Sequence, residues 1–319
     1  MRRPGEPPKI ELHVHLEDTV RPATLLEIAR RNDAVLPATT LEELRAWYAY
    51  RSISDFFVIW RATTSALRTG EDFRQIAVEY AAEASGHGAG YVEAIFTCSR
   101  PMREGRGAEV MAGFAAGADE AYDRFGLLMR FTPDIYRGME LDVALETARH
   151  AARYAGRGVV GLGIGGMEGG VPLSDYGEAF AIARDAGLAL LPHAGESAGP
   201  ESVREALTLW PERIRHGVRA VEDADLLTEL RERGIVVDVC PTSNVRTGAV
   251  SSLAEHPLPQ LVEAGVLCSI GTDDPAMFGT DLTAEFAIAE RPGVSADAAY
   301  RAGLAGAQCD NLRSLLDLD

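Results

Sequence analysis

Eight short apolar segments alternate with helical segments along the sequence, and this alternation limits the possible fold more than any other feature. Strands separated by helices predict a parallel sheet. Eight such units in 319 residues predict a closed (β/α)8 barrel, the TIM barrel fold. A doubly wound sheet would need a glycine fingerprint after the first strand, where the sequence reads H-V-H-L-E-D. The predicted strands cover residues 9–16, 90–97, 127–133, 159–164, 188–191, 214–218, 235–240 and 267–271.

A long helical insert is predicted between the first two strands. Apolar residues recur there at intervals of three and four, as in Leu25, Ile28 and Ala29, which is typical of amphipathic helices. The insert is predicted to hold helices over residues 22–32, 41–50, 55–67 and 71–85. Later helices are predicted over residues 108–125, 141–154, 174–186, 220–233, 259–264 and 282–316. No linker interrupts this order, so we expect residues 1–319 to form a single barrel domain.

Composition excludes several classes of partner. A formal net charge of -17 makes a nucleic-acid backbone or an anionic membrane surface a poor partner. No apolar run approaches the roughly 18 residues of a membrane span, and no apolar segment follows the basic N-terminal residues as in a signal peptide. The scattered cysteines favour reduced thiols in a cytoplasmic protein; they are Cys98, Cys240, Cys268 and Cys309.

Histidine and acidic residues gather at the carboxyl ends of the predicted strands, where the chemistry of (β/α)8 barrels takes place. His13 and His15 are two residues apart, so both side chains are expected to face the lumen. Four histidines and two aspartates in one cavity would be costly to bury without a metal ion. Three imidazoles with one carboxylate fit zinc. The strand-end residues are His13, His15, His193, Glu196, His216, Asp273 and Asp274.

Simpler interpretations exist for parts of this set. Taken alone, the segment P-H-A-G-E would also fit a capped strand end with two polar residues in solvent. A purely structural polar cluster is the alternative for the whole set. The other histidines, His87, His150 and His256, occur in helical or loop contexts and are predicted to be ordinary surface or packing residues.

Six segments together resemble the adenosine deaminase group of the amidohydrolase superfamily. They run in order across nearly the whole chain, as E-L-H-V-H-L-E, V-V-G-L-G-I-G-G-M-E, P-H-A-G-E, R-I-R-H-G, V-C-P-T-S-N and S-I-G-T-D-D-P-A-M-F. H-x-H alone is weak evidence, but the combination is highly specific. The resemblance implies a (β/α)8 barrel with one zinc ion and hydrolytic removal of an amino group from a purine.

The resemblance also implies roles for single residues. Zinc lowers the pKa of bound water toward neutrality, and His216 would orient this water and help to take its proton. Glu196 would give a proton to the ring nitrogen N1, which requires a raised pKa. The family also uses the aspartate at the position of Asp274 to hold the hydroxide and the purine. Two consecutive aspartates cannot, however, point the same way along an extended strand. The implied zinc ligands are His13, His15, His193 and Asp273. The implied substrate contacts are His15, Glu17, Asp274 and the backbone N–H of Gly166.

Some residues depart from the family pattern near the expected sugar side. Asp18 follows Glu17 where the family most often has glycine, and Gly163 stands where aspartate is common. Phe56, Phe57 and Trp60 lie where the family builds an apolar wall, although an amphipathic core face explains them nearly as well. The loop after the second strand holds Arg100, Arg103 and Arg106. These guanidinium groups would bind a carboxylate or phosphate at the far end of a substrate, or the loop would simply be solvated.

The leading hypothesis is zinc-dependent deamination of a 6-aminopurine nucleoside, with adenosine as the default substrate. The alternative substrate is adenine, or an adenosine derivative with an acidic substituent such as aminodeoxyfutalosine. A binuclear centre bridged by a carboxylated lysine is excluded, because the only lysine, Lys9, precedes the histidines of the first strand. A non-catalytic purine-binding barrel is the remaining alternative, and it would not need Glu196, His216 and both aspartates.

Overall fold

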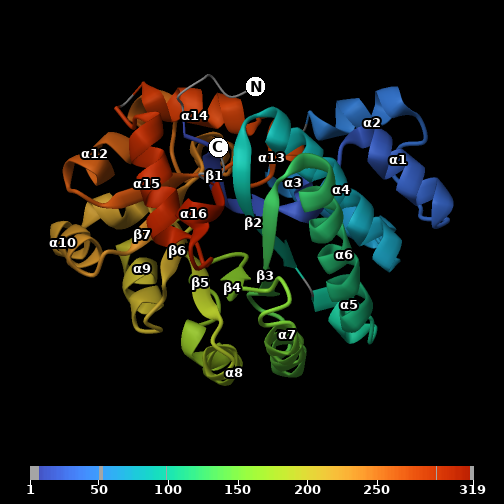
Figure 1. Ribbon diagram of the computed structural model, residues 1–319, viewed down its shortest axis with the longest axis horizontal. Helices are drawn as coiled ribbons and strands as arrows, with labels where there is room; N and C mark the ends of the chain where they lie inside the picture. Colours follow the sequence, from blue (N-terminus) through green and yellow to red (C-terminus); the bar gives the residue numbers. More distant parts are fainter. Residues whose placement is uncertain (1–6, 50–52, 98, 292, 317–319) are drawn as a thin grey trace.

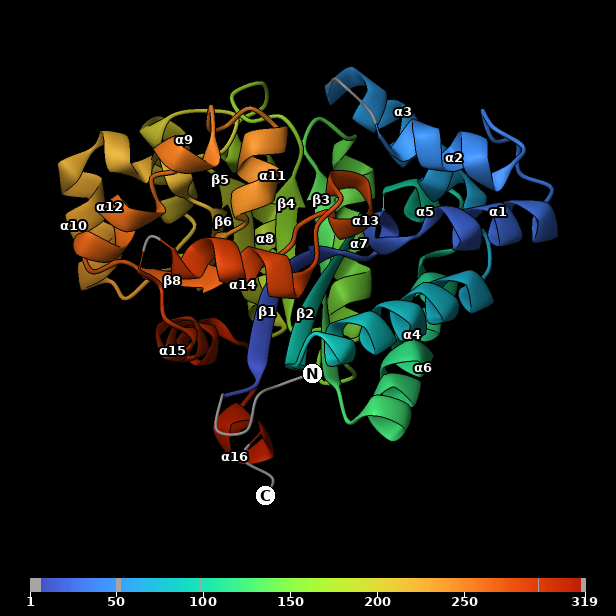
Figure 2. The ribbon, with the colours of Figure 1, turned by 90° about the horizontal axis from the view of Figure 1, so that it is seen from above.

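Eight parallel strands form the centre of the protein, whose computed structural model describes residues 7–49, 53–97, 99–291 and 293–316. Each strand pairs with the next one along the chain, and helices surround the sheet (Figures 1 and 2). The predicted (β/α)8 barrel is confirmed. The strands are β1 (Lys9–His15), β2 (Ala89–Thr97), β3 (Leu128–Tyr136), β4 (Gly161–Gly165), β5 (Ala189–Ala194), β6 (Arg213–His216), β7 (Val236–Val239) and β8 (Leu267–Ile270).

The barrel closes where the segment after β8 meets β1. Val14 and Asp273 form an isolated parallel bridge. The Asp273 N–H donates to the His13 carbonyl at 3.1 Å, and the His15 N–H donates to the Asp273 carbonyl at 2.8 Å. These bonds place the aspartates that follow the last strand directly beside the histidines of the first strand.

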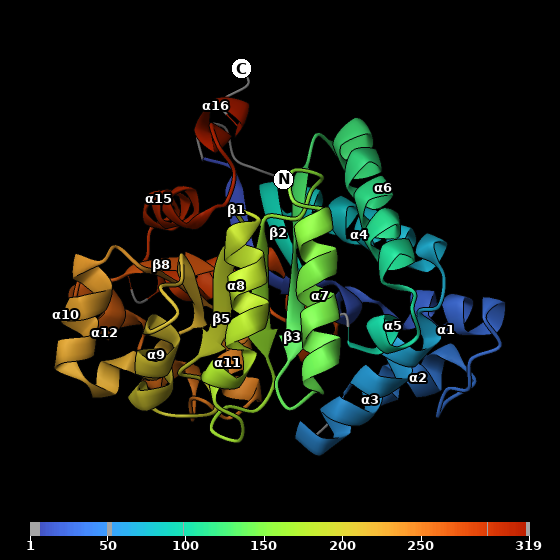
Figure 3. The ribbon, with the colours of Figure 1, turned by 90° about the horizontal axis from the view of Figure 1, so that it is seen from below.

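Four α-helices separate β1 from β2 and lie on one side of the barrel (Figures 1 and 3), as predicted. After the 3-10 turn η1 (Leu16–Thr19) they are α1 (Pro22–Arg31), α2 (Leu41–Tyr48), α3 (Ile53–Ala66) and α4 (Gly70–Gly86). Capping boxes at Thr40 with Glu43 and at Thr69 with Asp72 fix where α2 and α4 begin. Tyr50, the predicted end of the second helix, lies outside the described residues.

The later helices alternate with the strands and cover the outside of the barrel. No helix among the described residues is both long enough and apolar enough to cross a membrane. The α-helices are α5 (Ser99–Arg103), α6 (Gly107–Phe125), α7 (Leu141–Arg153), α8 (Gly177–Asp185), α9 (Pro200–Leu207), α10 (Ala224–Glu232), α11 (Pro241–Arg246), α12 (Leu258–Glu263), α13 (Pro275–Phe278), α14 (Leu282–Glu290), α15 (Ala296–Gly306) and α16 (Leu312–Leu316). The 3-10 helices are η2 (Leu173–Tyr176), η3 (Val218–Glu222) and η4 (Leu253–Glu255).

Several predicted boundaries are wrong, mostly at proline. β3 continues past Pro133 to Tyr136, and β5 continues through Pro192 to Ala194. Pro192 is tolerated because β5 pairs with β6 only from His193 onward, so no bond to β6 needs the missing N–H. α9 and α11 lie where no helix is predicted, although proline in the first turn of each favours a helix start.

Candidate active site and metal centre

A cavity of about 410 Å³ lies at the carboxyl ends of the strands, within the usual size range of small-molecule sites. Phe56, Phe57 and Trp60 of α3 contribute aromatic rings to its lining, at the positions where an apolar wall is predicted. His13 is fully buried behind the lining residues. The sequence-predicted residues that line the cavity are His15, Asp18, Gly166, His193, Glu196, His216, Asp273 and Asp274.

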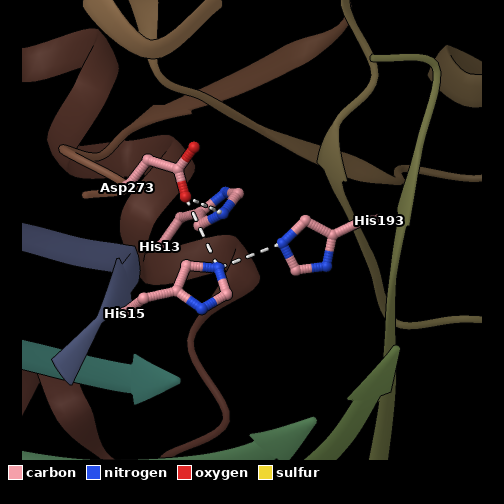
Figure 4. A group of neighbouring side chains, drawn as sticks. All are labelled: His13, His15, His193 and Asp273. Atoms are coloured by element: carbon pink, nitrogen blue, oxygen red, sulfur yellow. Dashed lines mark hydrogen bonds and ion pairs between the residues drawn. The ribbon is translucent and has the colours of Figure 1, made fainter. Parts of the chain in front are cut away.

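Three imidazoles and one carboxylate face a common point in this cavity (Figure 4). They come from β1, β5 and the segment after β8, and one ligand atom of each lies within 4.8 Å of all the others. His13 Nε2 lies 3.2 Å and His15 Nε2 lies 3.4 Å from Asp273 Oδ1. The Nε2 atoms of His15 and His193 are 3.3 Å apart. The sequence-predicted ligand set is thus brought together in full.

The protonation of these imidazoles suits a metal ion. Both ring nitrogens of His13 are buried; Nδ1 has no hydrogen-bond partner among the described residues, and Nε2 faces Asp273 Oδ1 at 3.2 Å. His193 Nδ1 lies 2.9 Å from the Ile164 carbonyl, so the proton is on Nδ1 and Nε2 presents a lone pair to the cluster. Burial lowers the pKa of all three histidines, for His15 to about 3, so the rings are neutral near pH 7. Neutral imidazoles are the form that binds metal ions.

Asp273 and Asp274 both reach the cavity because the chain leaves extended geometry after β8. Asp273 has a φ of 61°, in the left-handed region that residues other than glycine rarely adopt. Asp274 follows with φ -118° and ψ 67° as the N-cap of α13. This turn removes the difficulty that consecutive aspartates on an extended strand point in opposite directions. Ser243 donates to Asp273 Oδ2 at 2.5 Å, which leaves Oδ1 facing the histidines.

Glu196 reaches the site from a loop that Glu168 holds in place. The N–H groups of Gly195, Glu196 and Ser197 donate to the Glu168 carboxylate at 2.7, 2.9 and 2.8 Å. Burial alone would raise the pKa of Glu168, but the Ser202 hydroxyl and these N–H groups outweigh it and lower the pKa. Glu168 is therefore an ionised anchor for the loop. Burial raises the pKa of Glu196 itself, which favours a protonated carboxyl.

A chain of hydrogen bonds fixes the proton position on His216. The Leu258 N–H donates to His256 Nδ1 at 3.1 Å, so the proton of this neutral ring is on Nε2. His256 Nε2 lies 3.2 Å from Asn244 Oδ1, and Asn244 Nδ2 lies 3.1 Å from His216 Nδ1. The proton of neutral His216 is therefore on Nε2, 3.4 Å from Glu196 Oε2. Of the two roles predicted for His256, surface or packing, burial excludes the first, and the buried ring also belongs to this chain of hydrogen bonds.

An ion pair inside the barrel supports His193. His193 Nδ1 lies 3.3 Å from Asp134 Oδ2, and Arg215 pairs with the other oxygen of this carboxylate. The strand register places Asp134 opposite Gly163, where a Cβ would overlap both the guanidinium and the carboxylate. Gly163, noted above as a departure from the family pattern, is thus required by a carboxylate that β3 supplies.

Not all of the predicted substrate contacts line the first cavity. Gly166, with a φ of 98°, lines the cavity with its backbone. Asp18 interacts with Asp274, and burial raises the pKa of both carboxyls. Glu17 is not among the lining residues of this cavity; its Oε1 accepts the Thr97 N–H at 2.8 Å, and it lines a neighbouring cavity.

The predicted arginine loop folds partly into α5, and its cations are paired with acids. Arg100 and Arg106 both pair with Glu104, and Arg103 pairs with Glu140. None of the three arginines lines the first cavity, whereas Arg100 and Arg103 line the neighbouring one. Cys98, immediately before α5, lies outside the described residues.

Several residues that support the site were not singled out from the sequence. Ser243 and Asn244 belong to P-T-S-N and Glu168 belongs to G-G-M-E, so the segments that carry the resemblance contained a signal for them. Arg215 belongs to R-I-R-H-G in the same way. Asp134 and His256 have no such signal, because each stands outside these segments and acts through another side chain.

The fold and the site define a class of enzyme, a (β/α)8-barrel hydrolase that acts on carbon–nitrogen bonds. The sequence profile of the adenosine deaminase family matches residues 8–307. The chain belongs to this family.

Known relatives narrow the class further. The chain is 51% identical over 313 residues to an aminodeoxyfutalosine deaminase from Acidothermus cellulolyticus, covering 95% of this chain and 88% of that protein. It is 40% identical over 290 residues to an aminodeoxyfutalosine deaminase from Streptomyces avermitilis, covering 89% and 80%. These relatives, with the family profile, make the protein a deaminase of adenine-like compounds, and they favour the alternative substrate above over adenosine.

Solved structures agree with this assignment. An adenine deaminase from Arthrobacter aurescens superposes with a TM-score of 0.90 at 30% identity, covering 98% of this chain and 97% of that one. An amidohydrolase from Burkholderia ambifaria with bound zinc superposes with a TM-score of 0.88 at 28% identity, covering 96% and 87%.

Proposed function

We propose that the protein removes the 6-amino group from an adenosine derivative with an acidic substituent, such as aminodeoxyfutalosine. One observation carries the chemistry: Glu196 and His216 meet Asp273 at the edge of the four-residue cluster, with one ligand atom of each within 4.8 Å of the other two. The relatives from Acidothermus and Streptomyces support the substrate, because both are aminodeoxyfutalosine deaminases.

The cluster of His13, His15, His193 and Asp273 holds one zinc ion in this proposal. The neutral rings, the buried Nε2 of His13 beside Asp273 and the single carboxylate fit this ion. Bound zinc supplies a water of lowered pKa near neutral pH. Ser243, Asp134 and the Ile164 carbonyl orient the ligands from outside, as outer-shell partners do in other metal sites.

Glu196 is the proton donor in this proposal, and His216 is a hydrogen-bond donor. The half-buried carboxyl of Glu196, with its raised pKa, gives a proton to the purine ring nitrogen N1 while oxygen adds at C6. Addition then produces a neutral ring instead of a ring anion. Of the two protons of the attacking water, one replaces the proton that Glu196 has given up and the other passes to the 6-amino group, so ammonia leaves and the 6-oxo product keeps its proton on N1. His216 directs its Nε2–H toward the same space, where it orients the attacking oxygen by donating a hydrogen bond. Asp274, on the cavity wall, accepts from the substrate or from the attacking oxygen.

Ammonia release after a Glu196→Gln substitution tests this assignment. A glutamine of nearly the same shape cannot give up a proton, so we expect kcat to fall by about 100-fold or more. The matched control is Glu178→Gln on the exposed side of α8, which should not change kcat.

The metal content and the melting temperature of Glu196→Gln should equal those of the unaltered protein, because Glu196 is outside the ligand set. Normal turnover by Glu196→Gln would disprove the proton-donor role. The same assay run on the unaltered enzyme ranks the substrates, and we expect kcat/KM to be higher for aminodeoxyfutalosine than for adenosine or adenine. A clear preference for adenosine would disprove the substrate assignment.

A further inference from the structure

A second cavity, of about 550 Å³, adjoins the first one. Trp60, Thr97 and Tyr136 line both cavities. The rings of Trp60 and Tyr136 stack, with centroids 6.1 Å apart and an interplanar angle of 23°. The two cavities therefore adjoin at these residues, and a molecule that occupied both would have to pass them.

Aromatic rings form the inner surface of the second cavity. Phe73, Phe96 and Phe114 line it, and all three are buried. The Phe96 and Phe114 centroids are 4.3 Å apart, and those of Phe73 and Phe114 are 5.3 Å apart. Helices α3, α4, α5 and α6, which contribute to this lining, lie on the same side of the barrel (Figures 1 and 3). Such a surface suits a flat apolar group, since aromatic rings pack well against one another.

The second cavity also has an uncompensated cation. Three arginines line it, and two of them, Arg100 and Arg103, are neutralised by Glu104 and Glu140. The third, Arg61 of α3, is exposed, and no hydrogen bond or ion pair joins its guanidinium to any other described residue. A free guanidinium beside an aromatic surface suits a ligand that is apolar along its length and anionic at its end.

We propose that the second cavity binds an acidic tail of the substrate, an aromatic segment that ends in a carboxylate, with Arg61 as the partner of that carboxylate. The inference rests on the proposed function, because the tail is attached to the nucleoside in the first cavity. The nucleoside lies against the zinc cluster, and the linker passes Trp60, Thr97 and Tyr136. The aromatic segment packs on the phenylalanines. Arg100 and Arg103, already paired with acids, contribute positive potential without a direct bond.

Three probes and one substitution test the tail site. The probes are adenosine, adenosine extended at C5′ by a carboxyphenyl tail, and the neutral amide of the same extended compound. Arg61→Met keeps the length of the side chain and removes its charge. We expect it to raise KM for the acid-tailed probe by 10- to 100-fold with little change in kcat, at least ten times more than for the other two probes. Arg45→Met, an exposed substitution on α2 that lines neither cavity, should affect no probe.

Calorimetry on the Glu196→Gln background separates this proposal from the proposed function. If the unaltered enzyme releases no ammonia from any probe, the proposed function fails. The tail site is then decided by whether Arg61→Met weakens binding of the acid-tailed probe specifically. Equal effects of Arg61→Met on all three probes, or no effect on the acid-tailed probe, would overturn the tail site even if deamination proceeds normally.

Discussion

Two residues with unusual backbone geometry, His216 and Asp273, occupy central positions in the site. Their φ angles are 63° and 61°, in the left-handed region, and such conformations cost on the order of 1–3 kcal/mol each. Asp273 uses this conformation to turn the chain so that Asp274 also reaches the cavity. His216 uses it at the end of β6, next to Gly217 with a φ of 68°. The barrel tolerates this strain where it directs side chains toward one point.

His256 makes the stability of the protein sensitive to pH. Burial lowers its pKa from 6.5 to about 4, so the folded protein keeps the ring neutral where an unfolded chain protonates it. The contribution of the neutral ring is fully present above pH 6.5 and is lost as pH falls toward 4. We expect His256→Gln to reduce the dependence of the unfolding free energy on pH in this window, by up to about 1.4 kcal/mol per pH unit.

Urea unfolding of both proteins at several pH values between 4 and 7, with zinc present, measures this difference. Above pH 6.5 the unfolding free energies of the two proteins should differ by a constant amount, and this difference should shrink as pH falls. Parallel curves over the whole range would show that His256 titrates normally in the folded protein.

At the scale of elements, neighbouring residues of β3 and β4 together support one of the proposed metal ligands. Gly163 on β4 leaves room for the Arg215–Asp134 ion pair, and Asp134 in turn contacts His193. We expect Gly163→Ala to destabilise the fold by about 1–3 kcal/mol, because the added methyl group overlaps two buried charged groups that cannot move far. Urea unfolding measures the change.

Gly170→Ala is the matched control for that substitution. A Cβ at Gly170 meets no atom within 4 Å, and the effect should stay within about 0.5 kcal/mol. Equal effects of the two substitutions would mean that the space at Gly163 has no structural role.

Strands and ligands were predictable from the sequence because both leave local signals. Apolar runs predict the strands, and His13, His15, His193 and Asp273 lie in the last residues of a strand or just after it. The helix α11 was not predictable in the same way, since P-T-S-N reads equally well as a loop. The chain of hydrogen bonds that fixes the proton of His216 runs through Asn244 and His256 and depends on the backbone N–H of Leu258. No sequence periodicity or motif predicts such a contact.

At the scale of the whole molecule, the proposed metal links segments that are far apart in the sequence. The ligands run from His13 on β1 to Asp273 after β8, the two ends that close the barrel. A metal ion that binds only the folded protein stabilises it by mass action, by about 4 kcal/mol when its free concentration is a thousand times the dissociation constant. Loss of the metal should therefore loosen the closure of the barrel as well as abolish the chemistry.

Chelation tests this coupling between the metal and the fold. We expect removal of zinc by dipicolinate to lower the melting temperature by roughly 10 °C, and stoichiometric zinc to restore it. The substitution His13→Ala removes one ligand, so its melting temperature should already be low and should change little with chelator. Because His13 is buried without any other polar partner among the described residues, no competing interaction masks this difference. A protein that loses its zinc but keeps its melting temperature would show that the four-residue cluster is stable without a metal. The hydrogen bonds between β1 and Asp273 would then be enough to close the barrel.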